Sequence, residues 1–391
     1  MVKGCDLSEV FQRISLCDTL QREGRQSAGF HLNKEKSLQH ARIIDEIGID
    51  VLELNHPFSA PIFDELVREI SRMGLKTQVA AHVRFNLRDV KTAVETGVRR
   101  IHTYIPMDPK TVLTQRESLK KALSDLTNIT ELTKRNKIKL RVSVEHTFSL
   151  SLKIVSEIYK EISSVNGVDL VGVADTTGVC FPKKFTSFIK AIYEVIPPDT
   201  PIQFHLHNDH GLVAANFLEI IYLMEKNKNL KALFDISPGG LGERNGILSY
   251  GDVFSILYLL NPEFLKGKYN LKSYSKLIRF IERECNTILS RRDPLNVWAF
   301  SHSAGPHLMG MIQKSSYQVI PPEDFGLELK LNVGHCVTGY EGIRYFVKKD
   351  LNLLISEKQA KEIASKVRKV ASIKGQFTDR GLKKFILKEI D

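Results

Sequence analysis

Two histidines separated by one residue are the clearest sign of chemistry in this sequence. His205 and His207 lie in the segment FHLHND, which has the pattern of a strand end, so both imidazoles point to the same side. A lone histidine on a strand is usually structural, but a pair at this spacing suits two ligands of one metal ion. Glu23, in the segment DTLQREGRQ, supplies a third ligand if the fold brings the two segments together. The sequence therefore predicts a divalent metal ion bound by Glu23, His205 and His207.

A metal ion with one carboxylate and two imidazole ligands keeps several coordination positions free. A 2-oxo acid can fill two of them through its carboxylate and its keto oxygen, and the metal then polarises the carbonyl as a Lewis acid. Arg22, beside the predicted ligand Glu23, can add a cationic hydrogen-bond donor to the same oxygen. This chemistry serves both the formation and the cleavage of a C–C bond next to a carbonyl, so the spacing alone does not decide the direction.

Further polar side chains occur where other predicted strands end. In LRVSVEH, alternation places Arg141, Ser143 and Glu145 on one face of a strand. Polar groups facing a barrel interior are costly unless they are used, although a hydrogen-bonded polar layer is the alternative interpretation. The remaining polar strand ends are Glu53 in VLELN, the segment 82–86, the segment 175–178 (DTTG) and the glycine-rich GGLGERNG, which is equally compatible with a tight turn.

The elements that must position these groups are parallel strands joined by helices. Over roughly the first 260 residues, short β-rich runs alternate with longer amphipathic stretches, as in repeated βα units. Eight βα units are typical of a TIM barrel, whose catalytic groups come from the carboxyl ends of the strands. A doubly wound open sheet is the main alternative, but no GxGxxG follows the first strand. The predicted strands are Ile14–Asp18, Val51–Asn55, Lys76–Ala81, Arg100–Tyr104, Lys139–Glu145, Leu170–Asp175, Gln203–His207 and Ala232–Ser237.

The last part of the chain lacks the βα pattern and is predicted to be mainly helical. Two mostly helical stretches are expected near 271–289 and 356–373, with the unusual segment FSHSAGPHLMGMIQKSSYQVIPPEDFG between them. We therefore predict an α/β fold, with a (β/α)8 barrel over residues 1–265 followed by a smaller, mainly α-helical accessory region over 266–391.

Composition narrows the class of protein. The 391 residues are 42% hydrophobic and 26% charged, which is ordinary for a globular protein. We expect neither a secretory signal nor a membrane span, and the five scattered cysteines indicate free thiols in a reducing, cytoplasmic setting. The formal charge of +11 is spread along the chain, which favours small anionic substrates over a nucleic-acid partner.

With these residues in view, the sequence resembles the barrel family of metal-dependent acyltransferases and lyases. That family includes isopropylmalate synthases, homocitrate synthases and hydroxymethylglutaryl-CoA lyases. DTLQREGRQ resembles the family's arginine–acid–glycine motif, HLHND its HxHND metal motif and ADTTG its DTxG motif. RVSVEHTF, GLGERNGI, HSAGPH and VTGYEGIRYFV are most similar to segments of homocitrate synthases, and the resemblance covers nearly the whole chain.

The resemblance implies a role for each matching position. Arg22 would stabilise the carbonyl oxygen, and His307 and Tyr317, from the accessory region, would help to deprotonate acetyl-CoA. Because that region reaches into the partner's barrel in the family, a homodimer is implied. The implied metal ligands are Glu23, His205 and His207; Gln26 would lie near Arg22, Arg141 and Ser143 would bind the distal carboxylate of the 2-oxo acid, Thr176 its proximal carboxylate, and Glu53 and Glu145 would complete the polar site.

The sequence departs from homocitrate synthases near the substrate. Asn86 stands where they usually have His, His146 where they have Asp, and Ser149 where they have Arg. We expect an enzyme that condenses acetyl-CoA with a dicarboxylic 2-oxo acid and releases CoA. Because of the departures, oxaloacetate, giving citrate, stays an alternative to 2-oxoglutarate, giving homocitrate for lysine biosynthesis. A C–C lyase on the same scaffold and a basic nucleic-acid-binding protein are the more distant alternatives.

Overall fold

The computed structural model describes residues 7–55, 61–107, 110, 116–313 and 317–390. The chain divides between Pro294 and Leu295 into two compact units. The first holds the strands and helices that the βα pattern predicts, and the second holds the last four helices. The segment from residue 266 to Pro294 lies within the first unit, where α11 packs on α2. The predicted domain boundary at residue 266 stays a prediction.

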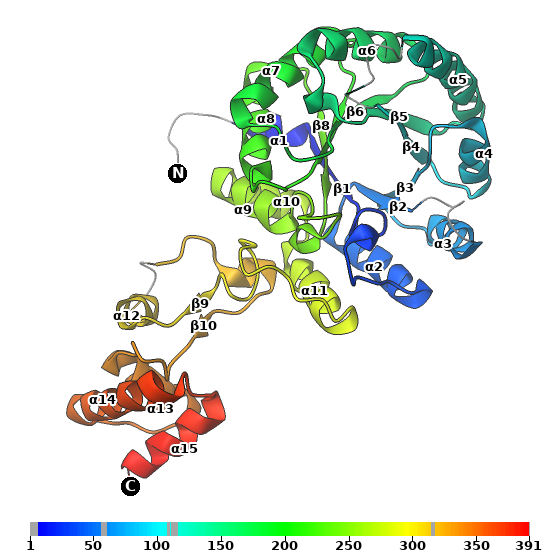
Figure 1. Cartoon of the computed structure of the whole chain (residues 1–391). Coiled ribbons are helices and arrows are strands. Elements are labelled where there is room, and N and C mark those ends of the chain that lie inside the picture. Colours follow the sequence, from blue (N-terminus) through cyan, green and yellow to red (C-terminus); the bar gives the residue numbers. More distant parts are fainter. Residues whose placement is uncertain (1–6, 56–60, 108–109, 111–115, 314–316, 391) are drawn as a thin grey trace. The chain divides into compact units, whose positions relative to one another are not determined.

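Eight parallel strands form a closed barrel in the first unit (Figure 1). β8 returns to β1, with Ala232 beside Ile14 and Ile236 beside Asp18. Each predicted strand is confirmed, with ends that differ from the prediction by two residues at most. The strands are β1 (Ile14–Asp18), β2 (Val51–Leu54), β3 (Gln78–His82), β4 (Arg100–Ile105), β5 (Lys139–Val144), β6 (Leu170–Asp175), β7 (Ile202–Leu206) and β8 (Ala232–Ile236).

Helices cover the outside of the barrel (Figure 1). They begin where the sequence offers a cap: Asn33 accepts a hydrogen bond from the backbone of Lys36 at the start of α2, and Ser151 caps α6 in the same way. The barrel helices are α1 (Ser8–Gln12), α2 (Lys34–Ile47), α3 (Pro61–Ser71), α4 (Leu87–Glu95), α5 (Arg116–Arg135), α6 (Leu152–Ser164), α7 (Pro182–Tyr193) and α8 (Val213–Lys226); α9 (Tyr250–Leu260), α10 (Pro262–Lys268) and α11 (Tyr274–Arg279) follow.

The interior of the barrel is layered. Inside the barrel lies an apolar layer, made of Cys17, Val51, Ala80, Leu170 and Leu233. Because side chains two residues apart on a strand share a face, the residues two places further along also point inward. Those residues are largely polar, so the barrel changes from apolar to charged toward the carboxyl ends of its strands. This is the end at which TIM-barrel enzymes hold their substrates.

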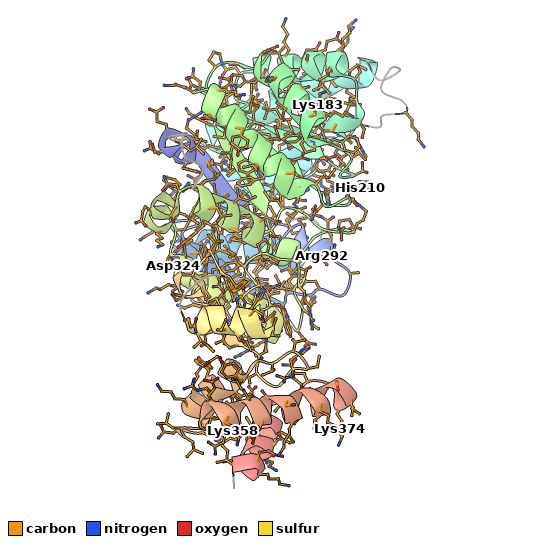
Figure 2. The ribbon with its side chains drawn as sticks, turned by 90° about the vertical axis from the view of Figure 1, so that its left-hand side faces the viewer. Lys183, His210, Arg292, Asp324, Lys358 and Lys374 are labelled. Carbon is orange, nitrogen blue, oxygen red and sulfur yellow. The ribbon has the colours of Figure 1, made fainter. Side chains whose placement is uncertain are left out.

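The second unit has its own core. A two-stranded parallel sheet pairs β9 (Ser301–His302) with β10 (Lys330–Leu331). The core includes Leu308, Ile343, Ile363 and Leu382, and Figure 2 shows Lys358 and Lys374 toward the two ends of α14. The helices are α12 (Gly305–Ile312), α13 (Tyr340–Asp350), α14 (Glu357–Lys374) and α15 (Asp379–Ile390). Among the described residues, no helix combines the length and apolar character of a membrane span.

One buried tyrosine ties three parts of the barrel together. The hydroxyl of Tyr159, on α6, donates to the backbone carbonyl of Gly172 on β6 at 2.7 Å and lies 2.9 Å from Oγ1 of Thr147. We expect Tyr159→Phe to lower the free energy of unfolding by about 1–3 kcal/mol, because buried polar partners lose their hydrogen bond. Urea denaturation measures the loss. The matched control is Tyr222→Phe, at an exposed tyrosine; equal effects in the two variants would contradict the assigned role.

Candidate active site

A cavity of about 260 Å³ opens at the carboxyl ends of the barrel strands. Most of the predicted site residues line it, although they come from four strands, β1, β5, β6 and β7, or from the loops after them. The lining residues are Arg22, Glu23, Gln26, His82, Tyr104, Arg141, Ser143, Glu145, Ala174, Thr176, His205, His207, Glu243 and Arg244. The structure therefore brings together nine residues that the sequence analysis selected. Their individual roles stay predictions.

Glu23, His205 and His207 are close enough to share one metal ion. Nε2 of His205 lies 3.6 Å from Oε2 of Glu23, and Nε2 of His207 lies 3.9 Å from Oε1. The ligand atoms of the three side chains all lie within 4.8 Å of one another. The two imidazole rings are nearly perpendicular, at 86°. One carboxylate and two imidazoles in this arrangement fit a divalent transition metal with positions left for a substrate.

The electrostatics of these three residues suit metal binding. Burial, and then the charge of Arg22, hold the pKa of His205 well below its ordinary value, and burial also lowers the pKa of His207. Both rings are therefore neutral near pH 7, as metal ligands must be. Burial acts to raise the pKa of Glu23, but the charge of Arg22 is the largest of the opposing effects, and that pKa is lowered overall. The carboxylate stays ionised, and its Oε1 accepts a hydrogen bond from the backbone of Glu243.

A second carboxylate orients His205. Nδ1 of His205 lies 3.0 Å from Oδ2 of Asp235, on the neighbouring strand β8, and a carboxylate there favours the tautomer that carries its proton on Nδ1. Oδ1 of Asp235 accepts a hydrogen bond of 2.6 Å from Nε2 of Gln203. With the proton held on Nδ1, the lone pair of Nε2 is directed toward Glu23. Such carboxylate–histidine pairs fix the tautomer of a metal ligand and raise its basicity.

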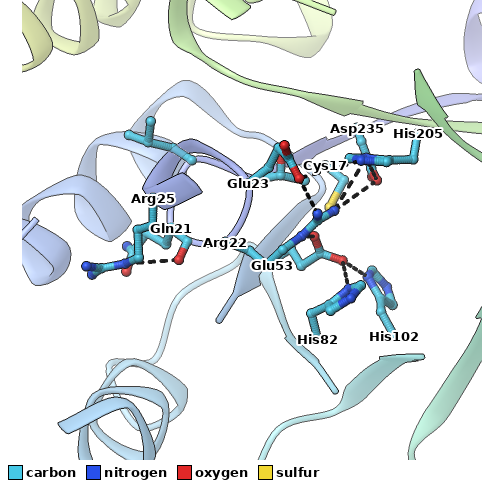
Figure 3. Close-up of polar contacts among 12 residues, drawn as sticks. Cys17, Gln21, Arg22, Glu23, Arg25, Glu53, His82, His102, His205 and Asp235 are labelled. Atoms are coloured by element: carbon cyan, nitrogen blue, oxygen red, sulfur yellow. Dashed lines mark hydrogen bonds and ion pairs between the residues drawn. The ribbon is translucent and has the colours of Figure 1, made fainter. Parts of the chain in front are cut away.

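Glu53 lies beneath this pocket, at the centre of a cluster of cations and histidines (Figure 3). Its carboxylate is fully buried; it accepts from Nε of Arg22 at 2.7 Å and from Nδ1 of His102 at 2.6 Å. Nδ1 of His82 lies 3.3 Å away, and Nη2 of Arg141 lies 3.5 Å away. Glu53 does not line the pocket. Glu53 instead contacts Arg22, His82 and Arg141, which line the pocket. The expectation that Glu53 contacts the substrate directly stays a prediction.

The floor of the pocket offers donors that lack partners. Arg141 is only 2% exposed, and among the described residues neither its Nε nor Oγ of Ser143 has a hydrogen-bond partner. Gly172, on the next strand, makes room for them: a Cβ there would lie 2.0 Å from Oγ of Ser143 and 3.2 Å from Cδ of Arg141. A carboxylate group of a ligand would satisfy these donors.

The rim combines residues that sequence analysis selected with others that it missed. The Oγ1 atom of Thr176 accepts a hydrogen bond from the backbone of His146, and burial raises the pKa of Glu145 above its ordinary value. His82 and Tyr104, also in the pocket lining, stack at 5.5 Å between ring centroids. The sequence analysis missed Tyr104, because the only sign of its role is its position two residues after His102, on the same inward face of β4.

Three predicted residues lie elsewhere. Asn86 is outside the pocket lining; its Oδ1 accepts from the backbone of Asp89 and caps α4. His307 and Tyr317 belong to the second unit, where their rings stack at 4.1 Å between centroids. The ring of His302 lies 5.8 Å from that of His307. The structure thus brings His307 and Tyr317 together, as a pair in their own unit.

The comparisons with known proteins agree with this architecture. Residues 13–281 match the family model described as HMGL-like. The chain belongs to the HMGL-like family. Residues 296–375 match a second model, described as the homocitrate synthase post-HMGL domain-like family. The HMGL-like family is metal-dependent, and Glu23, His205 and His207 form a possible metal site in this chain.

Several curated relatives align over most of the chain. The cytosolic isozyme of homocitrate synthase from Saccharomyces cerevisiae is 29% identical over 367 residues, which cover 93% of this chain and 83% of that protein. A homocitrate synthase from Pyrococcus horikoshii is 28% identical and covers 85% of this chain and 90% of its own length. The 2-isopropylmalate synthase of Methanocaldococcus jannaschii is 27% identical, covering 96% and 71% respectively. Together, the family and these relatives identify the HMGL-like chain as an acyltransferase enzyme.

A solved structure confirms the barrel. Hydroxymethylglutaryl-CoA lyase from Pseudomonas aeruginosa superposes with a TM-score of 0.54 at 18% identity, covering 70% of this chain and 94% of that one. At that identity the likeness establishes the fold alone.

The Asp235 contact predicts a specific loss of metal affinity. In Asp235→Asn, Gln203 donates to the amide oxygen, so the amide N–H faces Nδ1 of His205 and favours the tautomer that protonates Nε2. We expect metal affinity to fall about 10- to 100-fold. Competition with a chromophoric chelator measures it. Asp199→Asn, at an exposed aspartate paired with Lys231, is the matched control. An unchanged affinity in Asp235→Asn would refute the orienting role.

His102 predicts a dependence of stability on pH. Burial, and then Arg141, lower its pKa to about 3, while Glu53 opposes the shift. Between pH 6.5 and 5 the unfolded chain therefore binds a proton that the folded protein excludes, and stability falls on acidification by about 1.4 kcal/mol per pH unit for this group. His102→Asn keeps a donor for Glu53 and removes the titration.

The test compares the free energy of unfolding of metal-free protein at pH 6.5, 5.75 and 5. We expect the slope against pH to be shallower in His102→Asn than in the wild type, by about the contribution of one group. His31→Asn, at an exposed histidine, should keep the wild-type slope. Parallel slopes in His102→Asn and the wild type would show that His102 titrates normally in the folded protein.

Proposed function

We propose that this enzyme condenses the acetyl group of acetyl-CoA with a dicarboxylic 2-oxo acid, and that 2-oxoglutarate is the acceptor and homocitrate the product. The observation that carries the proposal is the pair of unsatisfied donors on Arg141 and Ser143, at the floor of the pocket that holds the metal ligands. A buried guanidinium there suits an acceptor that ends in a second carboxylate. An acceptor with an aliphatic end would leave Nε of Arg141, which has no hydrogen-bond partner among the described residues, without an acceptor.

The acceptor acid is oriented by both ends of the pocket. Arg141 and Ser143 bind the distal carboxylate, and Thr176 binds the proximal one near the metal ligands. A divalent ion on Glu23, His205 and His207 supplies a Lewis acid for the keto oxygen when it is bound. Arg22 donates to the same oxygen and stays charged, because Glu53 and Glu23 raise its pKa although burial acts to lower it. Gln26 lies at the same rim.

The acetyl donor requires a base, and the second unit offers one. We assign the removal of a methyl proton from acetyl-CoA to His307 with Tyr317, whose rings stack on each other. The resulting enolate carbon attacks the keto carbon, Glu145 assists the proton transfers, and water then releases CoA. Delivery of His307 by a partner subunit makes the enzyme a homodimer.

Two narrower assignments belong to the same proposal. Oxaloacetate is the alternative acceptor, since Arg141 pairs equally with its distal carboxylate. The cytoplasm is the proposed compartment, although relatives of similar identity are named as cytosolic and as mitochondrial isozymes.

The test is release of free CoA thiol from acetyl-CoA and a panel of 2-oxo acids, with and without a chelator. We expect chelator-sensitive release with 2-oxoglutarate, and loss of both bound metal and activity in Glu23→Ala. Release with oxaloacetate instead would identify a citrate synthase. No release with any acid, from metal-loaded protein, would contradict the proposal; production of acetyl-CoA or pyruvate from a hydroxy acid substrate would identify a lyase.

Arg141→Ala isolates the distal carboxylate contact. We expect the KM for the dicarboxylic acid to rise roughly 100-fold with a smaller change in kcat, because about 2–3 kcal/mol of charge-assisted bonding is lost. Arg135→Ala removes an arginine whose side chain is 79% exposed and should leave both constants unchanged. Unchanged constants in Arg141→Ala would remove the basis for a dicarboxylic acceptor.

A further inference from the structure

A second and larger cavity lies at the opposite end of the barrel. It has a volume of about 740 Å³ and is lined by residues at the amino ends of the strands and the loops before them. Val51, Leu170 and Leu233 line it and also belong to the apolar layer inside the barrel. Among the described residues, this cavity shares no lining residue with the active-site pocket. It is therefore separated from the active-site pocket by that layer.

Arg100, at the start of β4, is the unusual residue of this cavity. Its side chain lines the cavity and is 7% exposed. Nη2 donates to Oε1 of Gln78 at 2.9 Å, but within the described part of the chain neither Nε nor Nη1 has a hydrogen-bond partner. A buried guanidinium with unmet donors is costly, and native proteins rarely leave one uncompensated. The structure thus leaves a positive charge in need of an acceptor.

The acidic residues around the cavity are already engaged. Oxygens of Asp45, Asp50 and Asp169 accept hydrogen bonds of 2.7–2.8 Å from the backbone at the starts of neighbouring strands. Asp50 also lies 3.5 Å from Nζ of Lys268 and accepts from Tyr269. These carboxylates fix strand ends. No ion pair within 4.0 Å joins them to Arg100 in the described residues.

Basic side chains outnumber the acidic ones at this end. Five basic residues line the cavity against three aspartates. Arg13 is committed to backbone carbonyls at the end of α8, and Lys231 to Asp199. Lys139 sits beside Arg100 in the strand register, and Lys76 lies in the loop before β3. Within the described ranges, the side-chain ammonium groups of these two lysines have no hydrogen-bond or ion-pair partner. The local field is therefore positive.

We propose that this cavity is a binding site for a small oxyanion, a phosphate or a carboxylate, held by Arg100 with Lys139. The anion accepts charge-assisted hydrogen bonds from the guanidinium and neutralises the excess positive charge. Because the apolar layer separates it from the active-site pocket, the site fills independently of the acyl-transfer substrates. The inference stands apart from the proposed function, since it uses no residue of that site.

The test is isothermal titration of the full-length protein with inorganic phosphate, and separately with succinate, at constant ionic strength. We expect saturable binding, with the tighter ligand identifying the anion as a phosphate or a carboxylate. Arg100→Met should weaken it at least about 10-fold, as loss of a charge-assisted bond requires. Arg99→Met removes the exposed neighbouring arginine and should bind as the wild type does. Arg141→Met should also keep the binding that Arg100→Met weakens, because any succinate that Arg141 holds in the active-site pocket is a separate event.

Three results would overturn the proposal. They are no binding of either anion to the wild type, undiminished binding by Arg100→Met, and loss of binding in Arg141→Met rather than in Arg100→Met. The last would place the anion in the active-site pocket. If Arg100→Met fails to fold, Arg100→Lys keeps the charge but loses the planar fork, and Lys139→Met removes the second cation. Each should still weaken binding measurably, and unchanged affinity in both would equally refute the site.

Discussion

The barrel depends on one buried carboxylate and the cations that neutralise it. Glu53 has no exposed surface, and an isolated charge in such a position would be several kcal/mol unfavourable. Arg22 from the loop after β1 and Arg141 from β5 both bind it. Glu53 therefore fixes the distance between the side of the pocket that holds the metal ligands and the side that holds the unsatisfied donors. A change in its position would move both halves of the site together.

This arrangement explains why the barrel interior is divided into layers. TIM barrels normally fill their interior with branched apolar side chains, and here that filling is concentrated in the layer of Cys17 and its neighbours. The polar layer above it contains hydrogen bonds between strands, as from Gln203 to Asp235, in place of apolar packing. Such a layer specifies geometry rather than adding stability, because each charge needs its partner. The two cavities at the ends of the barrel share no lining residue among those described.

Much of this was predictable from the sequence, and the failures have physical causes. The alternation of β-rich and amphipathic stretches predicted the eight strands, and the alternation of residues within one strand predicted the inward face of Arg141. The proximity of Glu23 and His205 follows from the closure of the barrel between β1 and β8. The role of His102 was not predictable, because its partner Glu53 is far away in sequence and no local pattern marks it. The position of Asn86 fitted both a substrate contact and a helix cap. An asparagine three residues before Asp89 is also a helix cap, and capping is what the structure shows.

The same division of the barrel interior into layers relates the net charge of the chain to anion binding. A net charge of +11 without clustering does not resemble a nucleic-acid surface, which requires a continuous basic stripe. At each end of the barrel, however, a buried guanidinium has donors without a partner among the described residues: Arg141 on one side of the apolar layer and Arg100 on the other. Small anions such as 2-oxo acids are drawn toward a positive molecule and captured where a cation is desolvated, since the Coulomb attraction is strongest there. The lysines and arginines spread over the chain thus attract small anions to the protein, while the two buried arginines bind them.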